Sequence, residues 1–402
     1  MSEGRILLLE NIHPGAKQIL EQQGYEVELQ KKALSEEDLA KALDGVLALG
    51  IRSKTYVTPK VLEAARDLRV IGAFCIGTNQ IALGDAHTRG IPAFNAPFSN
   101  TRSVAELVMS EVVALSRRLT DRCAEMHQGR WTKSAEGCRE VRGKTLGIVG
   151  YGHIGRQVGV LAELFGLNVV FHDIVSQLPM GNNKVASGLA EVLETADFVT
   201  LHVPATPQTA NMIGAAELAL MKPSACLLNL SRGNVVVIEA LADAIRSGRL
   251  AGAAIDVFPV EPRSNEEPFE SALRGLPNVI LTPHVGGSTE EAQIAIGVEV
   301  ATAVTRYLQK GTTLGSVNFP LADLSSLPKT HRIQHLHKNV PGVLGDVHRI
   351  CAAHTANVLG QVLVTDPSLG YLLMDLEDDD PAADITRELA QLKTTLFARQ
   401  LY

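Results

Sequence analysis

Three features of this 402-residue chain predict an α/β protein built largely from parallel sheets. Short apolar stretches alternate with amphipathic stretches of helical spacing, which is typical of strands and helices in a parallel sheet. A glycine-rich turn between an apolar and a helical stretch lies near the middle of the chain, at 145–155. Beyond residue 329 the expected order becomes β-α-β-β-α-β, which is ferredoxin-like. We therefore expect two or three domains, each with its own core.

The first hundred residues alternate strand and helix but contain no glycine-rich turn. Ser35 is the expected cap of a helix that carries Glu36 and Glu37 in its first turn. One long helix is predicted over 104–128, because apolar residues recur there at helical spacing. We expect strands at 5–9, 25–29 and 45–49 and helices at 14–23 and 35–43.

From residue 145 onward the alternation continues as far as a linker at 320–329. The helical pattern at 290–308 is expected to return the chain to the first region, so that the N-terminal domain is built from two separate segments. Before the linker we expect strands at 146–149, 167–172, 198–202, 225–229, 252–258 and 279–281 and a helix at 237–247. After it we expect strands at 331–337, 358–365, 370–377 and 395–401 and helices at 342–353 and 381–392.

The turn at 145–155 matches the dinucleotide-binding pattern G-x-G-x-x-G between a buried strand and a helix. Gly150 permits the tight turn, Gly152 lets the backbone approach a pyrophosphate, and Gly155 lets helix and strand pack closely. The helix that begins near His153 presents free N–H groups to the anion. The motif alone is weak evidence, because 34 glycines make chance matches easy.

Asp173 strengthens the cofactor interpretation, since it ends the next strand, 23 residues after Gly150. A carboxylate at this point accepts hydrogen bonds from the adenosine ribose hydroxyls. It also predicts NAD rather than NADP, because it repels a 2′-phosphate and the next three residues, Ile174, Val175 and Ser176, offer no cation. The alternative is an ordinary solvated aspartate at a strand end.

The composition excludes several classes of protein. A net charge of −7 and a pI near 6.0 argue against nucleic-acid binding, because no basic surface is available to displace phosphate counterions. The five cysteines are scattered and form no C-x-x-C pair, so we expect neither a disulfide framework nor a metal site. No apolar run approaches 18 residues, so we expect a soluble, cytoplasmic protein with no membrane partner.

Three charged residues, Arg232, Glu261 and His284, follow successive predicted strands, where ligands bind in open α/β sheets. Hydride transfer between an alcohol and NAD needs a group that takes the hydroxyl proton, and an imidazole suits this role. His284 is the candidate, with Glu261 to orient the ring and Arg232 to clamp a carboxylate or carbonyl. Each residue alone could be an ordinary loop or surface residue, but the three together favour catalysis.

The chain resembles the D-isomer-specific 2-hydroxyacid dehydrogenase family over nearly its whole length. The likeness is carried by the glycine motif and by Asn-x-Ser-Arg-Gly, Asp-Val-Phe-x-x-Glu-Pro and Thr-Pro-His-x-Gly-Gly. Segments 72–82 and 95–106 resemble the branch that acts on a phosphorylated acid, and the tail is similar to a serine-binding ACT domain. The resemblance implies NAD-dependent oxidation of 3-phospho-D-glycerate to 3-phosphohydroxypyruvate, the first step of phosphorylated serine synthesis, with inhibition by serine.

The resemblance also implies a role for individual residues. His284, Glu261 and Arg232 match the acid–base histidine, its carboxylate partner and the substrate-orienting arginine. Cofactor contacts are implied for Gly150, Gly152, His153, Ile154, Gly155, Asp173, Asp256, Gly286 and Gly287. The backbone of Ile76 and Gly77 would hold the substrate carboxylate, and Arg52 and Ser53 its phosphate. Roles for Lys31, Lys133 and Gln293 stay open.

Three domains are expected. They are a split, flavodoxin-like substrate domain (1–99 and 292–325), a doubly wound Rossmann-type NAD domain (100–291) and a ferredoxin-like ACT domain (326–402). The resemblance places serine at His337, Asn339 and Asn357, where two tails pair. A homodimer through the NAD domains, and a tetramer if the tails also pair, is expected.

Two alternatives stay open. The enzyme could act on another D-2-hydroxyacid, such as 2-hydroxyglutarate, glycerate or lactate. A protein of another class, an NAD-sensing scaffold or corepressor, would use the same fold with little turnover.

Overall fold

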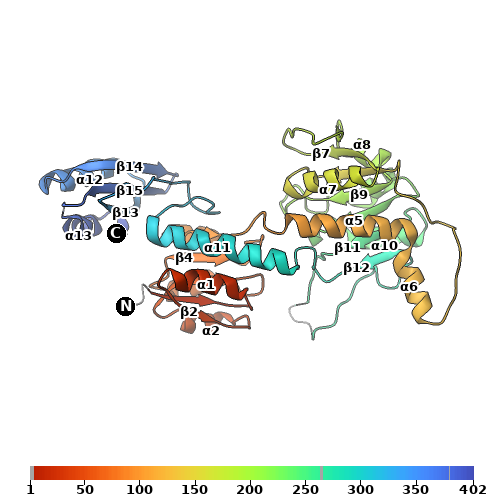
Figure 1. The fold of residues 1–402 in the computed structure, drawn as a ribbon, viewed down its shortest axis with the longest axis horizontal. Coiled ribbons are helices and arrows are strands. Elements are labelled where there is room, and N and C mark those ends of the chain that lie inside the picture. The colour runs from red at the N-terminus through yellow and green to blue at the C-terminus, as the bar shows by residue number, and fades with distance from the viewer. Residues whose placement is uncertain (1–3, 263–265, 380) are drawn as a thin grey trace. The chain divides into compact units, whose positions relative to one another are not determined.

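A computed structural model of the protein describes residues 4–262, 266–379 and 381–402 (Figure 1). The chain divides into two compact units, one formed by residues 1–99 with 293–402 and the other by residues 100–292. No helix in the described ranges is both long and apolar enough to cross a membrane.

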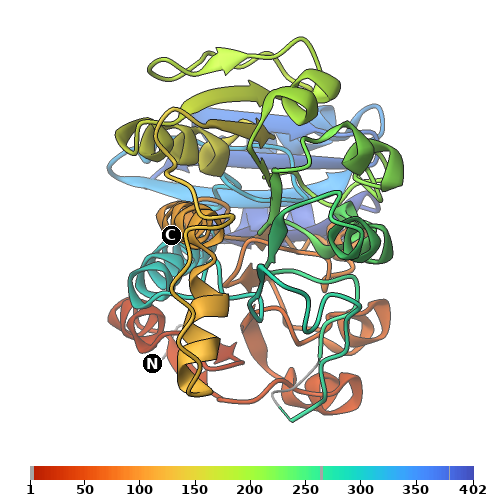
Figure 2. The ribbon, with the colours of Figure 1, turned by 90° about the vertical axis from the view of Figure 1, so that its right-hand side faces the viewer.

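The unit of residues 100–292 contains a seven-stranded parallel sheet with helices on both faces (Figure 2). The strand order is β12-β11-β10-β9-β6-β7-β8. The chain therefore adds β7 and β8 on one side of β6 and β9 to β12 on the other, which confirms the predicted doubly wound, Rossmann-type fold. The strands are β6 (Thr145–Val149), β7 (Asn168–His172), β8 (Lys184–Val185), β9 (Phe198–Leu201), β10 (Cys226–Asn229), β11 (Gly252–Ile255) and β12 (Val279–Leu281).

Two apolar cores cover the two faces of this sheet. Helices α5 and α7 pack with one core, and α8, α9 and α10 with the other. The helices are α5 (Thr101–Arg117), α6 (Leu119–His127), α7 (His153–Leu164), α8 (Leu189–Thr195), α9 (Ala215–Leu220) and α10 (Ile238–Arg246). A short 3₁₀ turn, Gly233–Val235, precedes α10.

The prediction of one helix over 104–128 is wrong, because the helix breaks at Arg118. The backbone of Arg118 is left-handed, with φ of 48°, and its N–H bonds back to Ala114 and Leu115, which ends α5. An arginine gives no sequence signal for this conformation, so the apolar periodicity alone suggested a continuous helix.

The other unit holds a five-stranded parallel sheet of order β2-β1-β3-β4-β5, the flavodoxin-like order. Its strands are β1 (Arg5–Leu8), β2 (Glu26–Leu29), β3 (Val46–Ile51), β4 (Val70–Ala73) and β5 (Ala93–Phe94). Its helices are α1 (Pro14–Gln22), α2 (Glu36–Ala42), α3 (Pro59–Ala64) and α4 (Leu83–Thr88). Helix α11 (Glu290–Lys310) packs Val300 and Val304 against Gly72 of β4, where a Cβ would approach Val300 to 2.8 Å.

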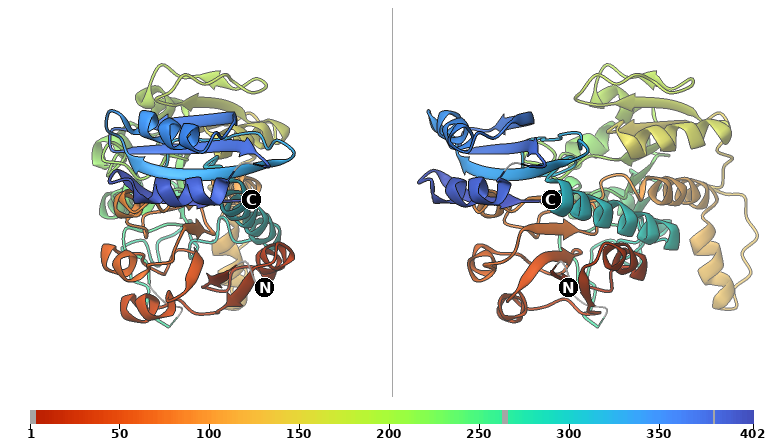
Figure 3. Two further views of the ribbon diagram at one scale, coloured as in Figure 1. Left: turned by 90° about the vertical axis from the view of Figure 1, so that its left-hand side faces the viewer. Right: turned by 60° about the vertical axis from the view of Figure 1, so that its left-hand side comes forward.

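The same unit contains a second, four-stranded antiparallel sheet of order β14-β15-β13-β16 (Figure 3). Its elements are β13 (Thr330–Lys338), α12 (Val343–Ala353), β14 (Val358–Thr365), β15 (Leu369–Glu377), α13 (Ala382–Gln391) and β16 (Thr395–Gln400), which confirms the ferredoxin-like order. Helices α12 and α13 pack on one face. Apolar side chains of the other face, including Leu336 and Tyr371, join the core around α11 and the first sheet.

A buried ion pair fixes the segment that connects α11 to the second sheet. Arg332 on β13 and Asp375, its register partner on β15, are both fully buried, and two guanidinium nitrogens donate to the two carboxylate oxygens at 2.6 Å. The guanidinium also donates to the carbonyls of Lys310, Leu324 and Ser325. Five hydrogen bonds thus satisfy a buried charge and hold the connecting segment on the sheet.

We expect Asp375→Ala to destabilise the protein by about 3–5 kcal/mol, because it leaves the Arg332 guanidinium buried without its counter-charge. Urea unfolding followed by circular dichroism measures this loss. Asp379→Ala, an acidic residue just beyond β15, is the matched control and should have little effect. An equal loss in both variants would contradict this role for the pair.

Candidate active site

The residues predicted to carry chemistry follow neighbouring strands of the seven-stranded sheet. Asn229 at the end of β10 pairs with Ile255 of β11, and Ile255 pairs with Leu281 of β12. Because these strands are parallel, the segments that carry Arg232, Glu261 and His284 leave the sheet at the same edge.

His284 and Glu261 form a hydrogen-bonded pair. The Nδ1 atom of His284 lies 2.9 and 3.1 Å from the two carboxylate oxygens of Glu261. The backbone at His284 is left-handed, with φ of 56°, an uncommon conformation that its N–H stabilises by donating to the Asp256 carbonyl at 2.8 Å. The contact at Nδ1 leaves Nε2 to exchange a proton with a ligand.

The pair shifts both ionisations toward the charged forms. The hydrogen bond from Glu261, helped by its negative charge, raises the pKa of His284 above its usual value, although burial acts in the opposite direction. Burial alone would raise the pKa of Glu261, but the bond and charge of His284 outweigh it and lower that pKa. The arrangement therefore favours an imidazolium beside a carboxylate.

Arg232 completes the set. It is half-buried, and its Nη1 atom donates to the Ser231 carbonyl at 2.7 Å. Its positive charge lowers the pKa of both Glu261 and His284, so it acts on the pair electrostatically. The side chain of Asn229, which the sequence reasoning missed, shapes this turn by donating to the Arg232 carbonyl at 2.9 Å.

Asp256, predicted as a cofactor contact, holds the loop that carries His284. Its buried carboxylate accepts hydrogen bonds from Thr282 Oγ1 at 2.5 Å and from the N–H groups of Val285 and Gly286 at 2.8 Å each. A Cβ at Gly286 would lie 3.0 Å from this carboxylate, so close packing favours glycine there. A contact between Asp256 and the nicotinamide stays a prediction.

Gly287, the other predicted cofactor glycine of this loop, is packed as closely. A Cβ there would lie 2.2 Å from the side-chain nitrogen of Asn100.

The glycine-rich turn has the shape that a dinucleotide requires. Gly150 has φ of 90°, and a Cβ there would lie 2.4 Å from the His202 carbonyl. A Cβ at Gly155 would lie 2.2 Å from the Gly150 carbonyl. At Gly152, by contrast, a Cβ would meet nothing within 4 Å, so this face of the turn has room for a pyrophosphate beside the start of α7.

The predicted neighbours of the turn lie around it. His153 and Ile154 form the first turn of α7, and Ile154 packs against the core. Asp173 accepts hydrogen bonds from the N–H of Tyr151 at 2.7 Å and of Val175 at 2.9 Å. These residues fit a bound NAD.

Glu111 on α5 is a further ionisable residue near Asp256 that the sequence reasoning missed. It is buried, and neither carboxyl oxygen has a hydrogen-bond partner among the described residues. Burial, with the negative charge of Asp256, raises the pKa of Glu111 to about 8. The one sequence signal is an acidic residue on the apolar face of this helix.

The predicted substrate residues lie in the other unit, at the end of β3 and β4. Glu10 accepts hydrogen bonds from the N–H groups of Arg52, Lys54 and Thr55 and so shapes the loop of Arg52 and Ser53. The side chain of Gln80 donates to the carbonyls of Arg52 at 2.6 Å and Gly77 at 3.2 Å, which ties this loop to the one that holds Ile76 and Gly77.

The predicted serine residues lie at two ends of the antiparallel sheet. His337 is buried on β13, and Asn339 follows that strand and donates to the Asp366 carbonyl at 2.6 Å. Asn357 precedes β14 and donates to Glu377 at 3.1 Å. Their strand ends pair with opposite ends of β15, at Leu369 and Leu376, about 24 Å apart at 3.4 Å per residue. One chain does not bring Asn339 and Asn357 together.

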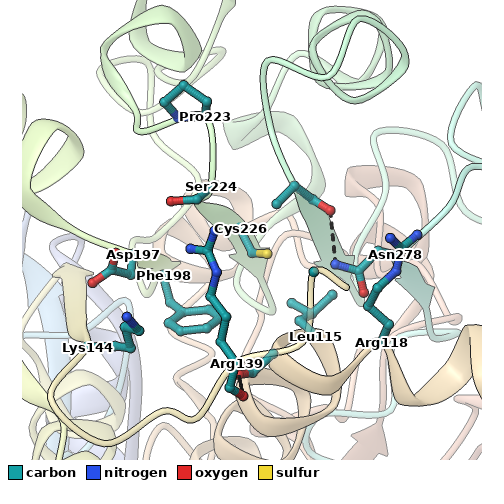
Figure 4. Close-up of a pocket in the computed structure, with 13 residues that line it drawn as sticks. Leu115, Arg118, Arg139, Lys144, Asp197, Phe198, Pro223, Ser224, Cys226 and Asn278 are labelled. Carbon is teal, nitrogen blue, oxygen red and sulfur yellow. Dashed lines mark hydrogen bonds between the residues drawn. The ribbon is translucent and has the colours of Figure 1, made fainter. Parts of the chain in front are cut away.

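A cavity of about 380 Å³ lies at the amino ends of strands in the seven-stranded sheet, away from these residues (Figure 4). Arg118, Arg139 and Lys144 line it together with Asp197, Cys226 and Asn278. None of the predicted catalytic or cofactor residues belongs to it.

Known proteins are similar to the whole chain. A family model described as the D-isomer specific 2-hydroxyacid dehydrogenase, NAD binding domain, matches residues 109–286, and an AHAS small subunit-like ACT domain model matches residues 333–397. D-3-phosphoglycerate dehydrogenase of Dictyostelium discoideum is 49% identical over 99% of this chain and 97% of that protein. The protein of that name from Escherichia coli K12 is 48% identical over 99% and 97%.

Solved structures show the same fold. The TT0316 protein from Thermus thermophilus matches with a TM-score of 0.68 and 31% identity, over 78% of this chain and 99% of that chain. A D-lactate dehydrogenase from Aquifex aeolicus, complexed with NAD and lactic acid, matches with a TM-score of 0.69 and 25% identity, over 78% and 99%.

We expect Glu261→Gln to lower the pKa of His284 toward its ordinary value, because the variant removes the negative charge that stabilises the imidazolium. An NMR titration of the His284 ring measures the shift. Since the folded-state pKa of His284 is raised, the pair stabilises the fold at acid pH and this contribution is lost as the pH rises through that pKa. Glu270→Gln, at an exposed ion pair with Arg274, is the control and should leave His284 unchanged.

We expect Glu111→Gln to stabilise the protein more at about pH 8 than at about pH 5. The folded state keeps Glu111 protonated up to about pH 8, so wild-type stability falls as the pH rises from the ordinary glutamate pKa toward that value. The loss should be about 1.4 kcal/mol for each pH unit in this window. Urea unfolding of both proteins across the window measures it, and parallel pH profiles would contradict the buried-acid assignment.

Proposed function

Because the chain belongs to the D-isomer-specific 2-hydroxyacid dehydrogenase family, we propose that it is the enzyme that oxidises 3-phospho-D-glycerate to 3-phosphohydroxypyruvate with NAD. Two observations support this activity. Relatives named D-3-phosphoglycerate dehydrogenase share about half of their residues with it over nearly their full length, and His284, Glu261 and Arg232 lie together at the carboxyl edge of an NAD-binding sheet. The grouping of these three side chains is the observation that supports the proposed reaction.

The proposed mechanism assigns one task to each residue. Arg232 clamps the carboxylate and carbonyl side of the substrate through its planar guanidinium. His284 accepts the proton of the substrate hydroxyl at Nε2, and Glu261 stabilises the imidazolium that forms. When bound, NAD supplies the hydride acceptor. In the reverse direction, the imidazolium returns its proton to the carbonyl oxygen.

The substrate and cofactor assignments follow the same logic. We assign the phosphate to Arg52 and Ser53 and the carboxylate to the backbone of Ile76 and Gly77. The tight turn with an open face at Gly152 supports the cofactor assignment, with Asp173 as the ribose acceptor. We propose that the functional division follows the three segments predicted from the sequence, and a cytoplasmic location stays a prediction.

Regulation by serine is the second part of the proposal. We assign serine to His337, Asn339 and Asn357 of the ACT domain. Because one chain places Asn339 and Asn357 at opposite ends of β15, a site that contains both needs two copies of the tail. This geometry supports tail pairing and, with a dimer through the NAD domains, a tetramer.

The purified protein should reduce NAD when given 3-phospho-D-glycerate at alkaline pH with a ketone trap. His284→Asn should lower kcat by roughly 10²- to 10⁴-fold, because the proton acceptor is lost. Arg52→Ala should raise KM for the phosphorylated acid without a matching effect on D-lactate or D-2-hydroxyglutarate. NADH absorbance measures each rate.

Arg66→Ala, at an exposed arginine of the same unit, is the control for Arg52. Turnover of only unphosphorylated acids would replace the proposed substrate. Full biological activity of the His284→Asn variant, with NAD still bound, would favour the scaffold alternative.

A further inference from the structure

A histidine of the five-stranded sheet region contacts the tail domain directly. His87 lies on α4, and its Nε2 atom is 2.6 Å from Oδ2 of Asp366, in the turn between β14 and β15. The two side chains are only 16% and 23% exposed. The His87 ring also packs against Phe319, with ring centroids 5.2 Å apart. The contact is therefore partly shielded from water, and Phe319 restrains the His87 ring as well.

Asp366 connects this histidine to the proposed serine site. Its backbone carbonyl accepts the hydrogen bond of Asn339 at 2.6 Å. Its Oδ1 atom accepts the N–H groups of Ser368 and Leu369 at 2.8 and 2.9 Å, and Oδ2 holds His87. Burial would raise the pKa of Asp366, but these donors lower it to about 2, so the carboxylate stays charged. A ligand that draws Asn339 away from the carbonyl acts directly on this turn.

On the other side, α4 leads back to the proposed substrate loops. The helix begins six residues after Gly77, and Gln80 lies between them. Gln80 donates to the carbonyls of both Arg52 and Gly77. Gln80 therefore connects the start of α4 to both loops through one side chain.

Elsewhere the tail also bonds directionally to α11, where Arg399 Nη2 donates to the Tyr307 carbonyl at 3.2 Å, but the contacts nearest the end of α4 are less directional. A Cβ at Gly90 would lie 2.9 Å from Phe397 and 3.0 Å from Leu336, and the Arg69 guanidinium lies over the Phe397 ring at 5.9 Å. Apolar surfaces tolerate small shifts, whereas the short hydrogen bond between His87 and Asp366 fixes one register.

We propose that the His87–Asp366 pair is the link through which serine at the tail domain changes the substrate loops. The proposal rests on the proposed function, since it takes Asn339 as a serine ligand and Arg52 and Gly77 as substrate contacts. The path runs from Asn339 through Asp366, His87 and α4 to Gln80. His87 is a positioning residue, not a catalytic one.

The test uses the full-length enzyme and compares wild type, His87→Ala and His87→Gln. Four quantities are measured for each: kcat and KM without serine, the serine Kd by calorimetry, and the change of rate at saturating serine. We expect His87→Ala to keep its basal kcat and its serine Kd within about twofold of the wild-type values. The change of rate at saturating serine should be at least about fivefold smaller than in the wild type. The glutamine can still donate to Asp366 and should restore much of it.

Reciprocity gives a readout that a merely structural role would not move. Substrate should shift the serine Kd in the wild type and in His87→Gln, but not in His87→Ala. Asp366→Asn, which keeps an acceptor for the Ser368 and Leu369 N–H groups, should behave like His87→Ala. Arg89→Ala, at the end of the same helix with an exposed ion pair to Glu63, should behave like the wild type.

The outcomes separate this link from the proposed function. If the wild type is inhibited by serine and His87→Ala is inhibited equally, the link alone is overturned. If His87→Ala no longer binds serine, the histidine maintains the site and does not transmit its state, which also overturns the link. If the wild type oxidises 3-phospho-D-glycerate but neither binds nor responds to serine, the link and the serine assignment are overturned together, and the dehydrogenase activity stands.

Discussion

The buried carboxylate of Asp256 is the interaction on which the proposed active site depends. Three donors from the 282–286 loop converge on it, and its own backbone carbonyl holds His284 in a left-handed conformation. Without these bonds the loop after β12 has no evident means of presenting the imidazole to Glu261. The reactive pair is partly exposed, but its position is set by a buried carboxylate that water does not reach.

In the other unit, a buried carboxylate likewise holds a loop through hydrogen bonds. Glu10 is buried at the end of β1, and its carboxylate accepts three backbone N–H groups of the 52–55 loop. In both units an acidic side chain therefore organises a loop at the carboxyl edge of a parallel sheet. In both loops, a side chain from another part of the unit accepts hydrogen bonds from several backbone N–H groups.

Sequence patterns predicted the fold class correctly, and continuous motifs supplied the candidate site residues, whose roles stay predictions. The doubly wound sheet followed from the glycine turn and the strand–helix alternation, and the tail followed from its element order. Strands β4 and β5 were not predicted, because they are short and wholly apolar and carry no alternation that distinguishes them from helix. The break at Arg118 was also not predicted, since an arginine gives no sequence signal for a left-handed backbone.

Long-range contacts were beyond sequence patterns for a simple physical reason. Asp256 and Thr282 are 26 residues apart, and His87 and Asp366 are 279 apart, so each pair is defined only after the strands have been ordered. The opposite placement of Asn339 and Asn357 likewise depends on strand direction.

This placement of the two asparagines at opposite ends of β15 has a genetic consequence. If serine needs Asn339 from one copy and Asn357 from another, a twofold pair of tails holds two shared sites, and a defective copy impairs its healthy neighbour. Two alleles defective at different asparagines would then rebuild one intact site in a mixed pair.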